Sequence, residues 1–211
     1  MPTSIRVGLI GLGRGTADLV LGLWGAKAHL PYLLASPKYH LVAVANSTVE
    51  SALKAIEYHN LSSEVKAYGS PSDLANDPNV DLVIVCVRVS KHYELTKPAL
   101  LAGKDVFVEW PLGASLKEAE ELEKMAKEKG VKTIMGLQAR ASPLIVKVKQ
   151  LVEKGEIGKV LSTTVVGSFT SFPHDIWPVG AEYYLYKDSG ANPLTVNFGH
   201  CMFRPFLAFY L

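Results

Sequence analysis

The sequence predicts an α/β fold, a doubly wound parallel sheet followed by the start of a second, incomplete α/β domain. Short apolar runs alternate with segments of helical periodicity through the first two thirds of the chain, which is typical of βαβ units. The run at residues 81–87, DLVIVCV, is apolar in every residue after Asp81, as a strand buried on both faces of a parallel sheet requires. A third observation is that the first apolar run, Ile5 to Ile10, leads directly into a glycine-rich turn.

Six strands are expected, at residues 5–10, 39–45, 66–68, 81–87, 105–108 and 132–136. Capping boxes at Ser47-Thr48-Val49-Glu50 and Ser115-Leu116-Lys117-Glu118 predict the starts of two helices, and Ser70-Pro71 predicts a third. Two more helices are expected, one from His92 to Gly103 and one from Ser142 to Lys154. The sixth strand closes the first domain, which we place at residues 1–137, with the second domain at 138–211.

The second domain contains one segment with the alternation of a strand, Val160 to Ser171, and no later segment to pair with it. A single strand is not a stable sheet. The final residues, CMFRPFLAFYL, are apolar with nothing after them to cover them. We therefore expect either a chain shortened relative to its relatives or a homo-oligomer that completes the sheet.

Composition excludes several classes of protein. The chain has 211 residues, 48% of them hydrophobic, with 22 basic and 20 acidic residues in no long run of one sign, which argues against direct nucleic-acid binding. No apolar stretch has membrane-spanning length and the first residues lack the pattern of a signal peptide, so a cytoplasmic location is expected, with the nucleus as an alternative. Cys86 and Cys201 are expected to be reduced and buried, and no metal site is predicted.

The glycine-rich turn, Gly11-Leu12-Gly13-Arg14-Gly15-Thr16, predicts a dinucleotide site. Gly11 would allow the tight turn and Gly13 would let the backbone approach a pyrophosphate. The third glycine of the fingerprint is displaced, because Thr16 occupies its position and Gly15 lies one place early. An ordinary turn between a strand and a loop is the alternative reading.

The end of the second expected strand bears on the choice of nucleotide. Asn46 lies where many NAD-specific domains place an acidic residue that holds the ribose 2′-hydroxyl. The neutral Asn46 and Ser47 leave room for a 2′-phosphate, and Arg14 is a candidate counter-charge. The predicted cofactor is therefore NAD or NADP.

Several motifs in the same order along the chain resemble the Gfo/Idh/MocA family of oxidoreductases. They are Gly11-Leu12-Gly13, Ala28-His29-Leu30-Pro31, His92, residues 102–106, Glu109-Trp110-Pro111 and residues 156–160. Within this family, residues 108–110, 137–143 and 197–200 resemble the fungal galactose-pathway repressor branch, which implies a fungal source, binding of a nicotinamide nucleotide and a transcriptional regulator as partner. The resemblance also implies an N-terminal Rossmann domain and a C-terminal α/β domain.

The chain departs from the family's catalytic pattern at two positions. Trp110 replaces the lysine of a Glu-Lys-Pro motif, and Val196 replaces an aspartate four residues before the histidine that matches His200. The remaining candidates for proton transfer are His200, Tyr183, Tyr184, Tyr186, Lys187 and His174. The resemblance implies a nicotinamide-side wall at Glu109, Trp110 and Pro111, although Trp110 packing under the second domain is an alternative, and His92 would either touch the cofactor or cap a helix.

Three functions remain. The first is an oxidoreductase-like protein that passes a hydride between the nicotinamide and an alcohol or carbonyl carbon of a sugar, polyol or secondary metabolite. The second is a catalytically inactive, nucleotide-sensing co-regulator of transcription, whose nucleotide shifts its affinity for a regulator. The third is an inactive, truncated remnant.

Overall fold

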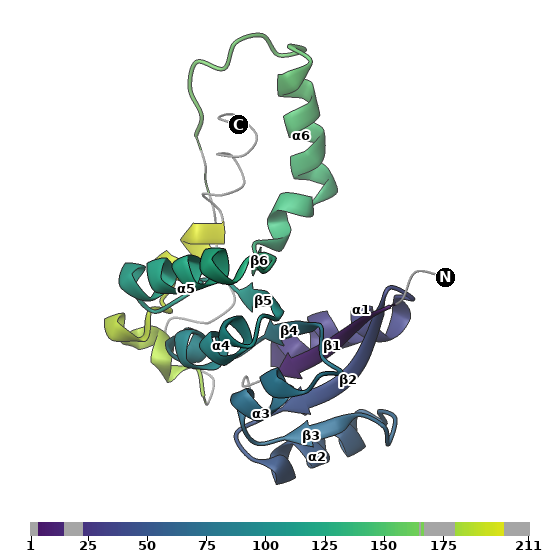
Figure 1. The fold of residues 1–211 in the computed structure, drawn as a ribbon. Coiled ribbons are helices and arrows are strands. Elements are labelled where there is room, and N and C mark those ends of the chain that lie inside the picture. Colours follow the sequence, from purple (N-terminus) through teal and green to yellow (C-terminus); the bar gives the residue numbers. More distant parts are fainter. Residues whose placement is uncertain (1–3, 15–22, 165, 167–179, 201–211) are drawn as a thin grey trace.

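The computed structural model describes residues 4–14, 23–164, 166 and 180–200. Its centre is a six-stranded sheet in the order β3-β2-β1-β4-β5-β6, in which every pair of neighbours is parallel (Figure 1). The strands are β1 (Ile5–Ile10), β2 (Tyr39–Ala45), β3 (Lys66–Tyr68), β4 (Leu82–Val85), β5 (Asp105–Glu109) and β6 (Thr133–Gly136). The predicted doubly wound sheet is confirmed, with all six expected strands present.

Helices cover both faces of the sheet. Against one face pack α3 (Pro71–Asn76), α4 (His92–Leu101) and α5 (Leu116–Lys129), around the buried side chains of Val83, Val85, Val106 and Val108. Against the other face pack α1 (Leu30–Ala35) and α2 (Val49–Tyr58), around Val7, Leu9 and Val44. The apolar strands are therefore buried on both sides, as the unbroken run in β4 predicted.

The chain reverses its winding at β1, which lies between β2 and β4. Ile10, the last residue of β1, is level with Ala45 of β2 and Val85 of β4. The carboxyl ends of these strands thus share one edge of the sheet, beside the point where the strand order changes direction. Ligands of open α/β sheets bind at such an edge, which is called the carboxyl edge below.

Two of the three predicted helix caps lie at the expected residue, and the third lies one residue later. Ser70 and Ser115 accept hydrogen bonds from the backbone N–H groups of Asp73 and Glu118. For α2 the cap is Thr48, which accepts from the N–H of Ser51, so the helix begins one residue later than the Ser47 box predicted. Gly130 ends α5 with a left-handed φ of 64°, as expected of a glycine after a helix.

Beyond the sheet, α6 (Pro143–Glu153) confirms the helix expected at residues 142–154, and Figure 1 shows it extending away from the sheet. The strand expected at residues 160–171 was wrong over the residues described, because 160–164 and 166 have no regular structure. The physical reason is that, in the part of the chain that the structure describes, no strand lies beside this segment to pair with its backbone. Residues 180–200 form short helical turns, including Glu182–Leu185, Lys187–Ser189 and Leu194–Phe198.

Candidate functional site at the carboxyl edge

The glycine turn that follows β1 is fixed by its neighbours. Gly11 has φ +97°, and a Cβ placed on it would lie 2.3 Å from the carbonyl oxygen of Cys86. Its N–H donates to the carbonyl of Ala45 at 2.9 Å. Gly11 therefore allows the tight turn that the sequence assigned to it, between the ends of β2 and β4. Gly15 and Thr16, where the fingerprint is displaced, lie outside the described residues.

Asn46 and His59 bind the backbone of this turn. The side-chain amide of Asn46 donates to the carbonyl of Leu12 at 2.9 Å and to that of Ser51 at 3.2 Å. The imidazole Nε2 of His59, at the end of α2, lies 2.8 Å from the carbonyl oxygen of Gly13. Sequence reasoning selected Asn46 and missed His59, because no motif marks a histidine that follows α2.

Among the described residues, the printed hydrogen bonds of the Asn46 side chain go to backbone carbonyls and not to a carboxylate. Ser47 and Arg14 are both exposed at this end of the edge, and Thr48 is occupied as the cap of α2. Glu50, the nearest acidic residue in the sequence, is paired with Lys54 on the surface of α2.

At the end of β5, Glu109 is held by two side chains from the segment that follows the glycine turn. Its Oε1 accepts from the indole Nε1 of Trp24 at 3.1 Å and lies 2.5 Å from Nε2 of His29. The Glu109 side chain is 12% exposed, and a Cβ on Gly136 of β6 would lie 2.5 Å from its Oε2. Trp24 and His29 thus connect the helical turn Gly25–His29, which Trp24 precedes, to the end of β5. Sequence reasoning did not connect these two residues to Glu109.

His29, Cys86 and Glu109 place a nitrogen, a sulfur and an oxygen within 4.8 Å of one another. In a tetrahedral zinc site such atoms lie about 3.3–3.8 Å apart, each 2.0–2.3 Å from the ion, whereas His29 and Glu109 are in direct hydrogen-bond contact at 2.5 Å. Burial, with the charge of Glu109, also raises the pKa of the Cys86 thiol, which disfavours the thiolate that binds a metal. The arrangement is that of a hydrogen-bonded pair beside a neutral thiol.

Trp110 and Pro111 follow Glu109 and are joined by a cis peptide bond. The indole Nε1 of Trp110 donates to the carbonyl of Thr195 at 2.8 Å, and a Cβ on Gly199 would lie 2.6 Å from that nitrogen. Only a glycine leaves room for the indole at this contact. Trp110 therefore joins the end of β5 to the segment at residues 194–200.

His92, at the start of α4, is fully buried. Its Nδ1 lies 2.7 Å from the carbonyl oxygen of Pro111 and its Nε2 lies 3.0 Å from that of Val87. Burial lowers the pKa of His92 although both carbonyls oppose the shift. Its ring thus faces backbone on both sides and links the start of α4 to Pro111 and Val87.

The tyrosine candidates are placed differently from one another. The guanidinium of Arg88 lies 5.5 Å from the centre of the Tyr183 ring, and the Tyr183 and Tyr184 rings are 4.7 Å apart. Burial raises the pKa of both hydroxyls. Tyr186 is 66% exposed. Lys187 is exposed and His200 is half-buried, while His174 lies outside the described residues.

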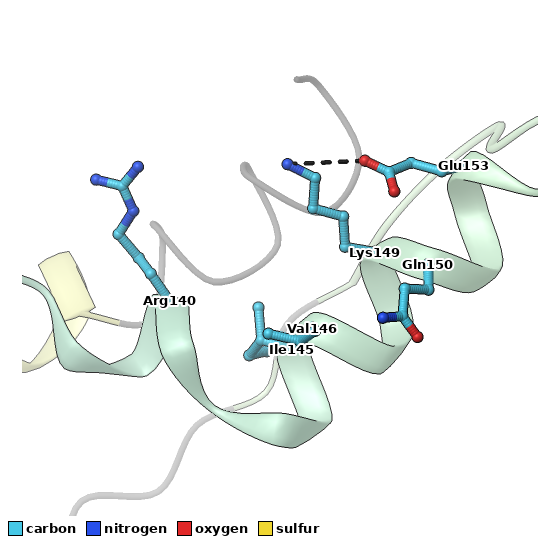
Figure 2. A pocket seen from close by; sticks show the side chains of 6 residues that line it. All are labelled: Arg140, Ile145, Val146, Lys149, Gln150 and Glu153. Atoms are coloured by element: carbon cyan, nitrogen blue, oxygen red, sulfur yellow. Dashed lines mark ion pairs between the residues drawn. The ribbon is translucent and has the colours of Figure 1, made fainter.

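A cavity of about 300 Å³ lies on α6, away from these groups. Figure 2 shows its lining side chains, with an ion pair of 3.8 Å between Lys149 and Glu153. The other lining residues are Arg140, Ile145, Val146 and Gln150. None of the predicted nucleotide-binding residues lines this cavity.

Two family profiles match the chain. Residues 5–137 match the Gfo/Idh/MocA profile, described as oxidoreductase family, NAD-binding Rossmann fold. The chain belongs to the Gfo/Idh/MocA family. Residues 143–206 match a second profile of Gal80p C-terminal domains, so the Gfo/Idh/MocA assignment covers the sheet and the Gal80p profile covers α6 and the segment that contacts Trp110.

Individual relatives of this Gfo/Idh/MocA protein include both an enzyme and a regulator. The dehydrogenase aclE of Aspergillus oryzae is 35% identical over 96% of this chain and 54% of its own length. The galactose/lactose metabolism regulatory protein GAL80 of Saccharomyces cerevisiae is 32% identical over 93% of this chain and 45% of its own. The crystal structure of the transcriptional regulator Gal80p from Kluyveromyces lactis superposes with a TM-score of 0.82 at 31% identity, covering 98% of this chain and 50% of that one. The chain thus spans about half the length of these relatives.

Among the described residues, no helix is long and apolar enough to cross a membrane.

Proposed function

We propose that this chain binds NAD or NADP at the carboxyl edge and that the bound nucleotide acts as a signal to a transcriptional regulator. The observation that carries this proposal is the placement of Trp110. The position of the family's lysine holds an indole that donates its only N–H to Thr195 and packs against Gly199. An indole is a hydrogen-bond donor without acid–base function at neutral pH, so the usual proton donor for hydride chemistry is replaced by a structural contact.

The proposed nucleotide site follows the edge of the sheet. Gly11 and Gly13 would face the pyrophosphate, and Arg14, Asn46 and Ser47 the adenosine ribose. The nicotinamide end would lie against Glu109, Trp110 and Pro111, supported by His92. In this proposal residues 1–137 form the nucleotide-binding domain, and residues 138–211 belong to a second domain that contacts it through Trp110.

Hydride transfer is the second candidate, favoured by the likeness to a dehydrogenase and by the pair of Tyr183 and Tyr184. The Tyr183 hydroxyl is protonated at neutral pH and would pass its proton to a carbonyl oxygen as hydride adds to the carbon. Burial raises the pKa of Tyr183, which makes the hydroxyl a weaker acid and counts against this role. The substrate would be a carbonyl or alcohol of a sugar, polyol or secondary metabolite. His200 and Tyr186 are the other candidates for this proton transfer, although Val196 leaves His200 without the family's aspartate.

Titration with NADH and NADPH tests the first part of the proposal. We expect micromolar binding, seen as energy transfer from tryptophan to the nicotinamide. Gly11→Val should abolish it, since a side chain at Gly11 meets the carbonyl of Cys86. Absence of binding by both nucleotides in the unmodified protein would leave the truncated remnant as the explanation.

A turnover assay distinguishes nucleotide signalling from hydride transfer. Protein that binds NADPH is offered a panel of sugar, polyol and ketone substrates while nicotinamide absorbance is followed. The proposal predicts no turnover, together with an affinity for a transcriptional activator that changes when nucleotide is added. Turnover that is lost in Tyr183→Phe but retained in Tyr186→Phe would establish hydride transfer instead.

A further inference from the structure

Two consecutive carbonyl groups of the glycine turn are held by side chains from other elements. The carbonyl of Leu12 accepts from the amide of Asn46, which follows β2, at 2.9 Å. The carbonyl of Gly13 is 2.8 Å from Nε2 of His59, which follows α2. Both contacts come from the β2–α2 unit, so both carbonyls are turned toward it.

The direction of these carbonyls determines where the N–H groups of the turn point. In a trans peptide the C=O and the following N–H point to opposite sides. With the carbonyls of Leu12 and Gly13 turned toward β2 and α2, the N–H groups of Gly13 and Arg14 are directed away from them. Among the described residues, neither of these two N–H groups donates a hydrogen bond. Successive N–H groups that point the same way form an anion site.

We infer that His59 is a positioning residue for the nucleotide, holding the Gly13 carbonyl so that the turn presents its N–H groups to a phosphate. This inference rests on the proposed nucleotide binding. His59 meets the turn at the carbonyl of Gly13, on the side opposite to these N–H groups, and its proposed contribution is to fix the peptide before the ligand arrives. A binding loop that is fixed in advance loses less conformational entropy when the ligand binds.

The His59 ring is suited to this task. It is half-buried, and it meets the ring of Tyr58 edge to face, with centroids 5.1 Å apart. Its hydrogen bond to Gly13 joins residues 46 positions apart in the sequence. The bond therefore connects the glycine turn to the end of α2. Without this donor the carbonyl of Gly13 has no hydrogen-bond partner among the described residues.

The inference is tested by comparing three variants for NADH and NADPH affinity. His59→Leu removes the donor at similar volume, and His59→Gln keeps an N–H at similar reach. His40→Leu is the matched control, because His40 is an exposed histidine at the opposite end of β2. The melting temperature of each nucleotide-free variant is measured alongside.

We expect His59→Leu to lower the affinity for NADH and for NADPH about tenfold, which is the effect of losing about one hydrogen bond. His59→Gln should restore most of the affinity and His40→Leu should bind as the unmodified protein does. Equal affinity in His59→Leu and the unmodified protein would overturn the inference while leaving nucleotide binding intact. Equal losses in His59→Leu and His59→Gln would also overturn it, since the donor would then not be what matters. If the unmodified protein binds neither nucleotide, the proposed function fails and this inference fails with it.

Discussion

Asp77 shows how the fold stabilises one buried charge. It is 5% exposed and accepts hydrogen bonds from Lys66 at 2.9 Å, Tyr68 at 2.7 Å and the N–H of Asn79 at 2.8 Å. Burial by itself would raise the pKa of Asp77, but the three donors outweigh it and hold the pKa well below its usual range. Burial and the bond to Asp77 raise the pKa of Tyr68 to about 12.

The free energy of unfolding should therefore depend on Asp77 in a defined pH range. Because the folded pKa is lowered, the contribution is fully present above the unfolded pKa of about 4 and is lost as the pH falls toward the folded value. Asp77→Asn should cost about 2 kcal/mol near neutral pH, and the difference from the unmodified protein should shrink below about pH 4. Urea unfolding across this range measures it.

Glu50→Gln is the control for this prediction. Glu50 is exposed and pairs with Lys54 on the surface of α2, where the charge is solvated and the pair contributes little. Its replacement should leave the pH profile of stability nearly unchanged. A profile for Asp77→Asn that runs parallel to that of the unmodified protein would contradict the account of Asp77.

At the same scale, sequence reasoning predicted only part of the site. Gly11 was predicted because it follows a recognisable strand, and Glu109 because its motif resembles that of the Gfo/Idh/MocA family. The partners of Glu109 were not, since Trp24 and His29 lie 85 and 80 residues away in the sequence. His59 was missed for the same reason, because its partner is a backbone carbonyl that no spacing rule marks.

At the scale of elements, α5 is an exposed, charged helix whose start depends on its cap. The Ser115 side chain accepts from the N–H of Glu118, and the Glu118 carboxylate accepts from the N–H of Ala114 at 2.8 Å. Ser115→Ala should lower the free energy of unfolding by about 1 kcal/mol, measured by chemical denaturation.

Ser162→Ala is the comparison for the cap, since Ser162 is exposed in a segment without regular structure. It should change stability much less than Ser115→Ala. Equal effects of the two substitutions would show that the cap of α5 does not limit the stability of the protein.

The same elements show why prediction succeeded for the sheet and failed beyond it. Apolar runs bounded by caps and glycines predicted the six strands, most clearly β1 and β4, most of whose residues are buried between two helical layers. The segment at 160–164 has a similar alternation, yet alternation gives a strand only when another strand lies beside it. The sequence of one segment shows whether that segment can form a strand, but it does not show whether a second strand lies beside it.

For the whole molecule, the notable surface is α6. Six of its eleven residues are aliphatic, none is buried, and Leu144 is 70% exposed. Exposed apolar faces of this kind promote association. We predict concentration-dependent self-association, measured by sedimentation velocity, that Leu144→Glu reduces.

Gln150→Glu provides the matched control, because it adds the same charge to an exposed polar position on the same helix. It should leave the association unchanged. A monomer at every concentration, or the same loss of association in both variants, would contradict a role for the apolar face of α6.

The position of β1 between β2 and β4 has a consequence for how the protein is made. Of the six strands in this sheet β1 is synthesised before the others. Asp81, which contacts Arg6 from the residue before β4, follows 75 residues later. At roughly 5–20 residues per second, the ribosome needs about 4–15 seconds to supply that partner. For this interval Val7 and Leu9, fully buried in the folded protein, have only one side of their strand paired. The order of synthesis therefore leaves the side of β1 that pairs with β4 without its partner until β4 has left the ribosome.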